Sequence, residues 1–85
     1  MSKRADWSRP LPRPIVIPGI MAIKTLADVR KLLGHIPKEA RQASTWQYVE
    51  ATLQACASGD DTANVSVALR LVLQAERVPY SVGLD

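Results

Sequence analysis

The first regular pattern of apolar and polar positions lies between residues 25 and 36. Apolar side chains recur there every three or four residues, the spacing that places them on one face of an α-helix: Leu26, Val29, Leu32, Leu33 and Ile36. Thr25 and Asp28 stand three residues apart at its start, as in a capping box, where side chains satisfy the free amides of the first turn. Gly34 and Pro37 predict that this helix ends near residues 34 to 36.

A second helical pattern begins at Ser44 and ends at Gly59. Ser44 and Gln47 repeat the three-residue spacing of a capping box. A narrow apolar stripe follows at helical spacing, formed by Trp46, Val49, Leu53, Cys56 and Ala57. Because Cys56 lies within the stripe, we expect a buried structural thiol rather than a reactive one. Residues 37–43, before this helix, predict a turn.

Residues 64–78 fit two periodicities. Five apolar residues alternate as in a strand, but the opposite strand face would mix apolar and charged side chains. On a helical wheel the polar side chains gather instead into one narrow strip: Ser66, Arg70, Gln74 and Arg77. We therefore predict a helix capped by Asn64 or Thr62, with Leu69 and Val72 near the middle of its apolar arc. We expect so wide an apolar arc to be buried on more than one side, by the N-terminal segment or by a second copy of the protein.

An extended, basic and proline-rich segment precedes these helices. Prolines occupy every second position from Pro10 to Pro14, and proline lacks the N–H group that pairs strands. Amides two residues apart share one edge, so the segment predicts a docking strand that pairs on its other edge only. That edge keeps the N–H groups of Leu11, Arg13 and Ile15. The alternative is a disordered tail over residues 1–13; in either case we expect residues 15–23 to pack onto the helices.

These patterns together predict an all-α fold. The expected architecture is a small bundle of three main helices over residues 24–78, with an extended, partly disordered Pro-rich arm over residues 1–23 and a frayed C-terminus over residues 79–85. A chain of 85 residues, 47% of them hydrophobic, fits one domain with a small core. The single cysteine allows no internal disulfide, which favours a cytoplasmic location, and no apolar run approaches the roughly 20 residues of a membrane-spanning helix.

No pattern of catalytic or metal-binding residues stands out. His35 is the only histidine, and no cysteine or paired carboxylates accompany it at ligand spacing. Asp60 and Asp61 are adjacent, without the alternating ligands of a calcium loop, and the four glycines are too scattered to cradle a phosphate. We therefore expect a protein that is not an enzyme and has no metal ion or other cofactor.

Four segments carry a family resemblance: "RPLPRPIVIPGIM", "TLADVRKLLGHIP", "STWQYV" and "NVSVALRLVLQ". They resemble a group of small helical bacterial proteins of unknown function, and the likeness covers most of residues 8–78. The resemblance implies a helical fold and a bacterial cytoplasmic setting. It implies no activity, cofactor or site residues.

Charge and exposed apolar surface together favour a protein–protein interaction or adaptor module that associates with itself. The net charge is +3, and the basic residues concentrate in residues 1–41 while acids outnumber bases afterwards. Tyr48, with two alanines on the same helix side, predicts a mildly apolar surface for a homodimer. The alternative is nucleic-acid backbone binding through the basic arm and first helix. The candidate interaction residues are Leu11, Arg13, Ile15, Ile17, Arg30, Lys31 and Tyr48.

Overall fold

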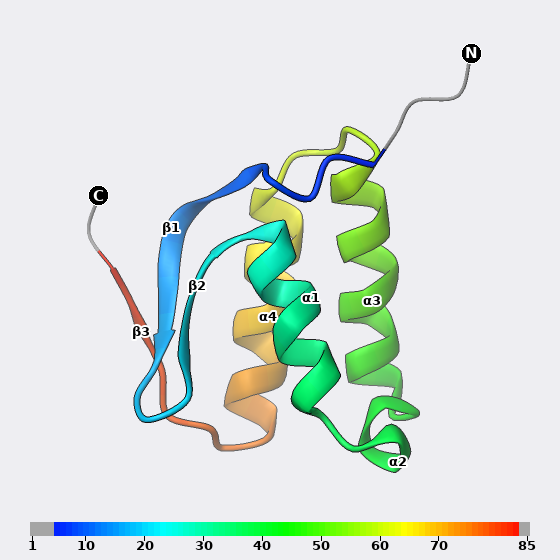
Figure 1. Ribbon diagram of the computed structural model, residues 1–85. Coiled ribbons are helices and arrows are strands. Elements are labelled where there is room, and N and C mark those ends of the chain that lie inside the picture. The colour runs from blue at the N-terminus through cyan, green and yellow to red at the C-terminus, as the bar shows by residue number, and fades with distance from the viewer. Residues whose placement is uncertain (1–4, 84–85) are drawn as a thin grey trace.

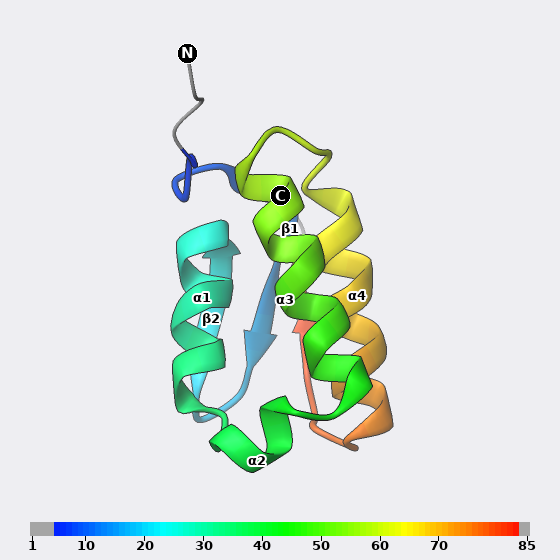
Figure 2. The ribbon, with the colours of Figure 1, turned by 90° about the vertical axis from the view of Figure 1, so that its right-hand side faces the viewer.

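The computed structural model describes residues 5–83 and has a mixed α/β fold, so the prediction of an all-α bundle was wrong. The elements along the chain are β1 (Pro10–Ile17), β2 (Met21–Thr25), α1 (Leu26–His35), α2 (Lys38–Arg41), α3 (Ser44–Ala57), α4 (Ala63–Ala75) and β3 (Ser81–Val82). The strands form one antiparallel sheet in the order β2-β1-β3. Helices α1 and α4 lie against one side of this sheet, and α3 lies across them on the side away from the strands (Figures 1 and 2).

The segment interpreted as an arm supplies two of the three strands. Its apolar residues flank a tight turn in which Gly19 has a φ of 77° and the Ile20 N–H donates to Ile17 O at 3.0 Å. Glycine adopts a positive φ at little cost, which suits it to this turn. Across the hairpin Ile15 lies opposite Ile23, and both side chains are buried against the helices. The expectation that this stretch packs onto the helices is confirmed for these isoleucines, but not for Ile20, which is 60% exposed.

Strand β1 pairs on both edges, which corrects the prediction of a strand that pairs on one edge only. On its second edge β1 lies beside β3, where Ile15 and Val16 face Val82 and Ser81. The pairing stops where the prolines begin, with a last hydrogen bond from Gly83 N–H to Pro14 O at 2.7 Å. Pairing on this second edge is limited to the half of β1 that follows the prolines, because a proline has no N–H to donate to a neighbouring strand.

Helix α1 begins as the sequence predicts. Thr25 Oγ1 accepts from Asp28 N–H, and the Asp28 carboxylate accepts from Thr25 N–H, so the capping box is complete. Asp28 Oδ2 also accepts from Lys24 N–H at 2.9 Å, an amide at the end of strand β2. The same carboxylate therefore begins the helix and ends the strand before it.

Helix α3 begins differently from the prediction. Its N-cap residue is Ala43, no side chain bonds to the free amides, and Ser44 is already the first helical residue. The stretch predicted as a turn contains the one-turn helix α2, whose backbone leads directly into α3. Gly59 follows α3 with a φ of 130°, in the positive region that favours glycine.

Helix α4 is a helix and not the alternative strand, and its start is fastened to the sheet. Thr62 is the N-cap residue, one of the two predicted, but its side chain makes no capping bond, and Asp61 Oδ1 accepts from Ala63 N–H at 2.9 Å instead. The Thr62 hydroxyl is turned inward instead and donates to Pro10 O at 2.9 Å. This bond joins the first turn of α4 to the first residue of β1.

Residues before β1 are fastened to the end of α3. The Arg9 Nη1 donates to the carbonyl oxygens of Cys56 and Asp60, the latter at 2.7 Å. Asp6 N–H donates to Ala57 O at 2.9 Å. Carbonyl groups at the end of a helix have no partner within the helix, and a guanidinium is well suited to satisfy them. Residues 1–4 of the predicted arm and residues 84–85 of the predicted frayed end lie outside the described residues.

The core lies between the sheet and the helices. As predicted, Leu69 and Val72 of α4 are fully buried, at 0% and 1% exposure. The other apolar side chains of the core come from α4 itself and from the other elements: Leu11, Ile15, Ile17, Ile23, Leu26, Val29, Leu32, Leu33, Trp46, Val49, Leu53, Cys56, Ala57, Val65, Ala68 and Leu73. The apolar arc of α4 is covered by β1 on one side and by α3 on another.

Candidate interaction surfaces

The structure separates the sequence-predicted interaction residues into buried and exposed groups. Leu11, Ile15 and Ile17 are buried in the core, where their side chains hold β1 to the helices. The exposed group is Arg13 on β1, Arg30 and Lys31 on α1, and Tyr48 on α3. These four side chains lie on three different elements and do not form one site.

Tyr48 belongs to a larger exposed apolar surface that spans α3 and α4. Three large apolar side chains on it are substantially exposed: Tyr48 at 59%, Val67 at 45% and Leu71 at 58%. Tyr48 and Leu71 line one shallow depression, and Tyr48 and Val67 line the next. We call this surface, centred on Tyr48, Val67 and Leu71, the outer face.

The outer face is almost free of charge. Asp60 is the one acidic residue that lines its two depressions. The other lining side chains are small or uncharged: Ser44, Thr45, Ala51, Thr52, Ala55, Asn64, Ala68 and Val72. Tyr48 was among the candidate interaction residues predicted from the sequence. Val67 and Leu71 were not, because they were assigned to the wide apolar arc of this helix. Val67 and Leu71 lie one turn apart on α4, on the side opposite buried Leu69. This four-residue spacing was the feature of the sequence that could have indicated a second, exposed apolar side.

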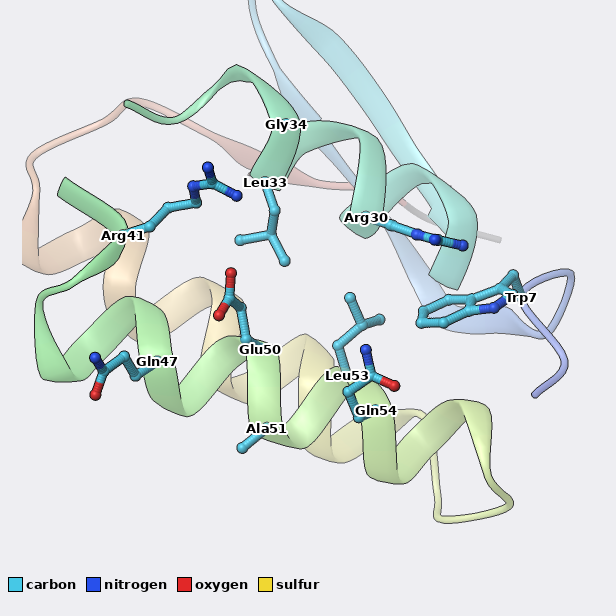
Figure 3. Close-up of a pocket in the computed structure, with 10 residues that line it drawn as sticks. All are labelled: Trp7, Arg30, Leu33, Gly34, Arg41, Gln47, Glu50, Ala51, Leu53 and Gln54. Atoms are coloured by element: carbon cyan, nitrogen blue, oxygen red, sulfur yellow. The ribbon is translucent and has the colours of Figure 1, made fainter. Parts of the chain in front are cut away.

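A groove with a cavity volume of about 600 Å³ lies between α1 and α3 (Figure 3). Leu33 and Leu53 provide its apolar surface. At one end the Arg30 guanidinium lies over the Trp7 ring, 4.6 Å from the ring centroid, in cation–π geometry. Trp7 therefore links the segment before β1 to α1, which its carbonyl oxygen also contacts by accepting from Ala27 N–H at 2.8 Å.

The charges in this groove are of both signs. The Glu50 carboxylate and the Arg41 guanidinium reach into it from α3 and α2 (Figure 3). Arg41 Nε is buried, and none of the residues that the structure describes forms a hydrogen bond with it. Because a carboxylate accompanies the guanidinium, the groove has no strong preference for a ligand of one charge.

A smaller pocket, of about 300 Å³, lies between β1 and α4. It is lined by Pro12, Arg13, Ala63, Ser66, Val67, Arg70 and Val82. The sequence placed Ser66 on the polar strip of its helix, but the residue is only 8% exposed. Arg70 Nε is buried and has no hydrogen-bond partner within the described part of the chain. The sequence could not indicate this pocket, because β1 and α4 meet only in the folded chain.

Two groups have perturbed pKa values. Hydrogen bonds from the Ser8 hydroxyl and backbone N–H lower the pKa of the Asp6 carboxyl. Burial raises the pKa of the Cys56 thiol, whose Sγ donates to Asp61 O at 3.3 Å. The expectation of a buried cysteine is confirmed, and a raised pKa keeps the thiol protonated and unreactive at neutral pH.

Among residues 5–83, no group of three or more histidine, cysteine or acidic side chains is placed to hold a metal ion. The helices of this same region are too short or too polar to cross a membrane. Comparison with known proteins gave no match to a protein-family model, to a curated protein or to a solved structure.

Proposed function

We propose that this protein is a non-enzymatic interaction module that associates with itself through the outer face. The observation that carries the proposal is the contiguous exposure of Tyr48, Val67 and Leu71 on two adjacent helices. Apolar surface gains roughly 25 cal/mol for each Å² removed from water, so three such side chains side by side favour a partner. Contiguous apolar patches of this kind mark interaction sites more often than single exposed residues do.

The chemistry of the outer face favours a second copy as the partner. In a twofold-symmetric dimer one patch meets the same patch, so a charge near the symmetry axis would meet its like, and a charge elsewhere would need an opposite charge on the same patch. The outer face carries only Asp60, at its margin, and is otherwise uncharged. Ala51 and Ala55 of α3 are small, which lets two helices approach closely. A strongly charged partner would find no complementary group on this face.

Sedimentation velocity over a range of protein concentrations tests the proposal. We expect the protein to form a dimer that dissociates on dilution, and Leu71→Lys to remain a monomer because it would bury a charge in the interface. Ile20→Lys is the matched control, since Ile20 is 60% exposed in the β1–β2 turn, away from the outer face. A protein that is monomeric at all concentrations, or a dimer equally weakened by both substitutions, would contradict the proposal.

Nucleic-acid backbone binding is the second candidate, and the exposed surface of α1 favours it. Arg30 and Lys31 are exposed on this helix, with exposed Lys24 before it and Lys38 after it. Arg9, a basic residue of the predicted arm, is not part of this surface, because its guanidinium is bonded to the end of α3. Binding to phosphates would weaken steeply as salt rises, through counterion release. A labelled duplex and single strands titrated at low and moderate salt test this candidate, with Lys31→Glu expected to weaken binding and a lack of binding at low salt contradicting it.

A further inference from the structure

The pocket between β1 and α4 brings together two arginines from distant parts of the chain. Arg13 reaches it from β1 and Arg70 from α4, and Ser66 lies one helical turn before Arg70. Val82 of β3 and Pro12 of β1 complete the side formed by the sheet. The pocket is formed by elements that the core fixes in place, because α4 and β1 pack directly on each other.

All three polar side chains that line this pocket can donate hydrogen bonds. Two guanidinium groups and one hydroxyl face a volume of about 300 Å³, and no carboxylate is among the lining residues. The α1–α3 groove differs, because Glu50 accompanies its arginines. Two guanidinium groups at one pocket repel each other unless an anion lies between them. The Nε of the Arg70 guanidinium is a buried donor with no hydrogen-bond partner among residues 5–83.

The backbone around the pocket also favours an anion. Prolines on both sides of Arg13 restrict the backbone there, so the Cα atom from which the Arg13 side chain extends is held in place. Ala63, the first residue of α4, lines the pocket and places the positive end of this helix beside it. The carboxylate of Asp61 accepts from Ala63 N–H at that helix start, so it partly offsets the helix dipole there.

We propose that Arg13, Arg70 and Ser66 bind an oxyanion, the phosphate or carboxylate group of a small ligand. Guanidinium groups bind both oxyanions through paired hydrogen bonds of fixed geometry, and the Ser66 hydroxyl supplies one more donor. The volume is at the small end of the range for ligand sites, so the pocket suits the charged group of a ligand better than a large apolar body. Neither arginine lines the depressions of the outer face, although Val67 lines both the pocket and one of those depressions.

Titration with anions, followed by two-dimensional ¹H–¹⁵N spectra, tests the proposal. Sodium phosphate is added in one arm and sodium acetate in the other, each compared with sodium chloride at equal ionic strength. We expect saturable shifts of the Arg70 Nε–Hε signal and of the Ser66 amide signal. The arm that produces them distinguishes a phosphate site from a carboxylate site.

Charge-removing variants separate a built site from general attraction of anions. Arg13→Gln and Arg70→Gln should each weaken binding by about tenfold or more, the scale of one charge-assisted hydrogen bond. Arg77→Gln removes an equal charge from an exposed position after α4, outside the lining of the pocket, and should leave binding within about twofold, the scale of screened surface charge. Because Arg13 is exposed, its variant should fold even if Arg70→Gln does not. Shifts that do not saturate, or that persist unchanged in Arg13→Gln, would show an adventitious ion only and overturn the proposal.

Discussion

Helix α4 has two apolar sides with different surroundings. Leu69 and Val72 are covered by the sheet and by α3, whereas Val67 and Leu71 of the same helix are about half exposed. The four residues are similar in chemistry and lie within two turns. What separates them is the position of β1, which comes to α4 from the other end of the chain and covers one side only (Figure 1). Apolar character alone therefore does not define the core of this protein.

The largest effect is expected when a side chain on the buried side of α4 is shortened. Leu69→Ala should lower the free energy of unfolding by about 2 to 5 kcal/mol, because it removes buried methyl groups and leaves a cavity. Urea denaturation at low protein concentration measures this loss. The matched variant Leu71→Ala lies half a turn away on the exposed side, and equal losses in the two variants would contradict the contrast between them.

The packing of β1 and α3 around the buried side of α4 also depends on Arg9. Arg9→Ala should lower the free energy of unfolding by about 1 to 3 kcal/mol, because its guanidinium bonds two carbonyl oxygens at the end of α3, just before α4. Thermal unfolding followed by circular dichroism measures the change. Arg13→Ala is the control for loss of an arginine, since Arg13 is exposed, and its effect should stay within about 0.5 kcal/mol.

A smaller effect is expected where β1 meets the start of α4. Thr62→Val keeps the shape of the side chain but removes the hydrogen bond to Pro10 O, which should cost about 1 kcal/mol. Thr52→Val is a matched control, because the Thr52 hydroxyl donates to Tyr48 O within its own helix and is not needed for contact between elements. Chemical denaturation of both variants compares them, and an equal cost would show that the bond to β1 has no special role.

The smallest effect on unfolding is expected on the exposed side of α4. Leu71→Ala should change the free energy of unfolding of the monomer by no more than about 0.5 kcal/mol, because the side chain already contacts water. The same substitution should weaken the dimer, as measured by sedimentation. A large loss of monomer stability would mean that Leu71 is covered within the chain.

The features that the sequence predicted correctly depend on residues close together in the chain. The capping box of Thr25 and Asp28 involves residues three apart, and the structure confirms it. The wheel of residues 64–78 correctly favoured a helix over a strand. Neither inference needed to know what lies beside the helix in space.

The features that the sequence missed depend on distant residues. The run of isoleucines on both sides of Pro18 and Gly19 is typical of a hairpin, but the prolines before it favoured a free arm. Strand β3 has only two residues, and such a short stretch has no periodicity to detect. The pocket of Arg13 and Arg70 likewise exists only because β1 packs on α4, so no local spacing could indicate it.

The prolines of β1 have a consequence for how copies of this protein can assemble. Beyond its bonds with β3, the second edge of β1 continues through a stretch where Pro12 and Pro14 have no N–H. A strand from another copy placed there would find acceptors with too few donors, so the sheet cannot lengthen along this part of β1. Contact through side chains on helices closes once two copies meet, whereas strand addition would lead to an open-ended polymer. The prolines thus remove one route to such a polymer, along the uncovered edge of β1.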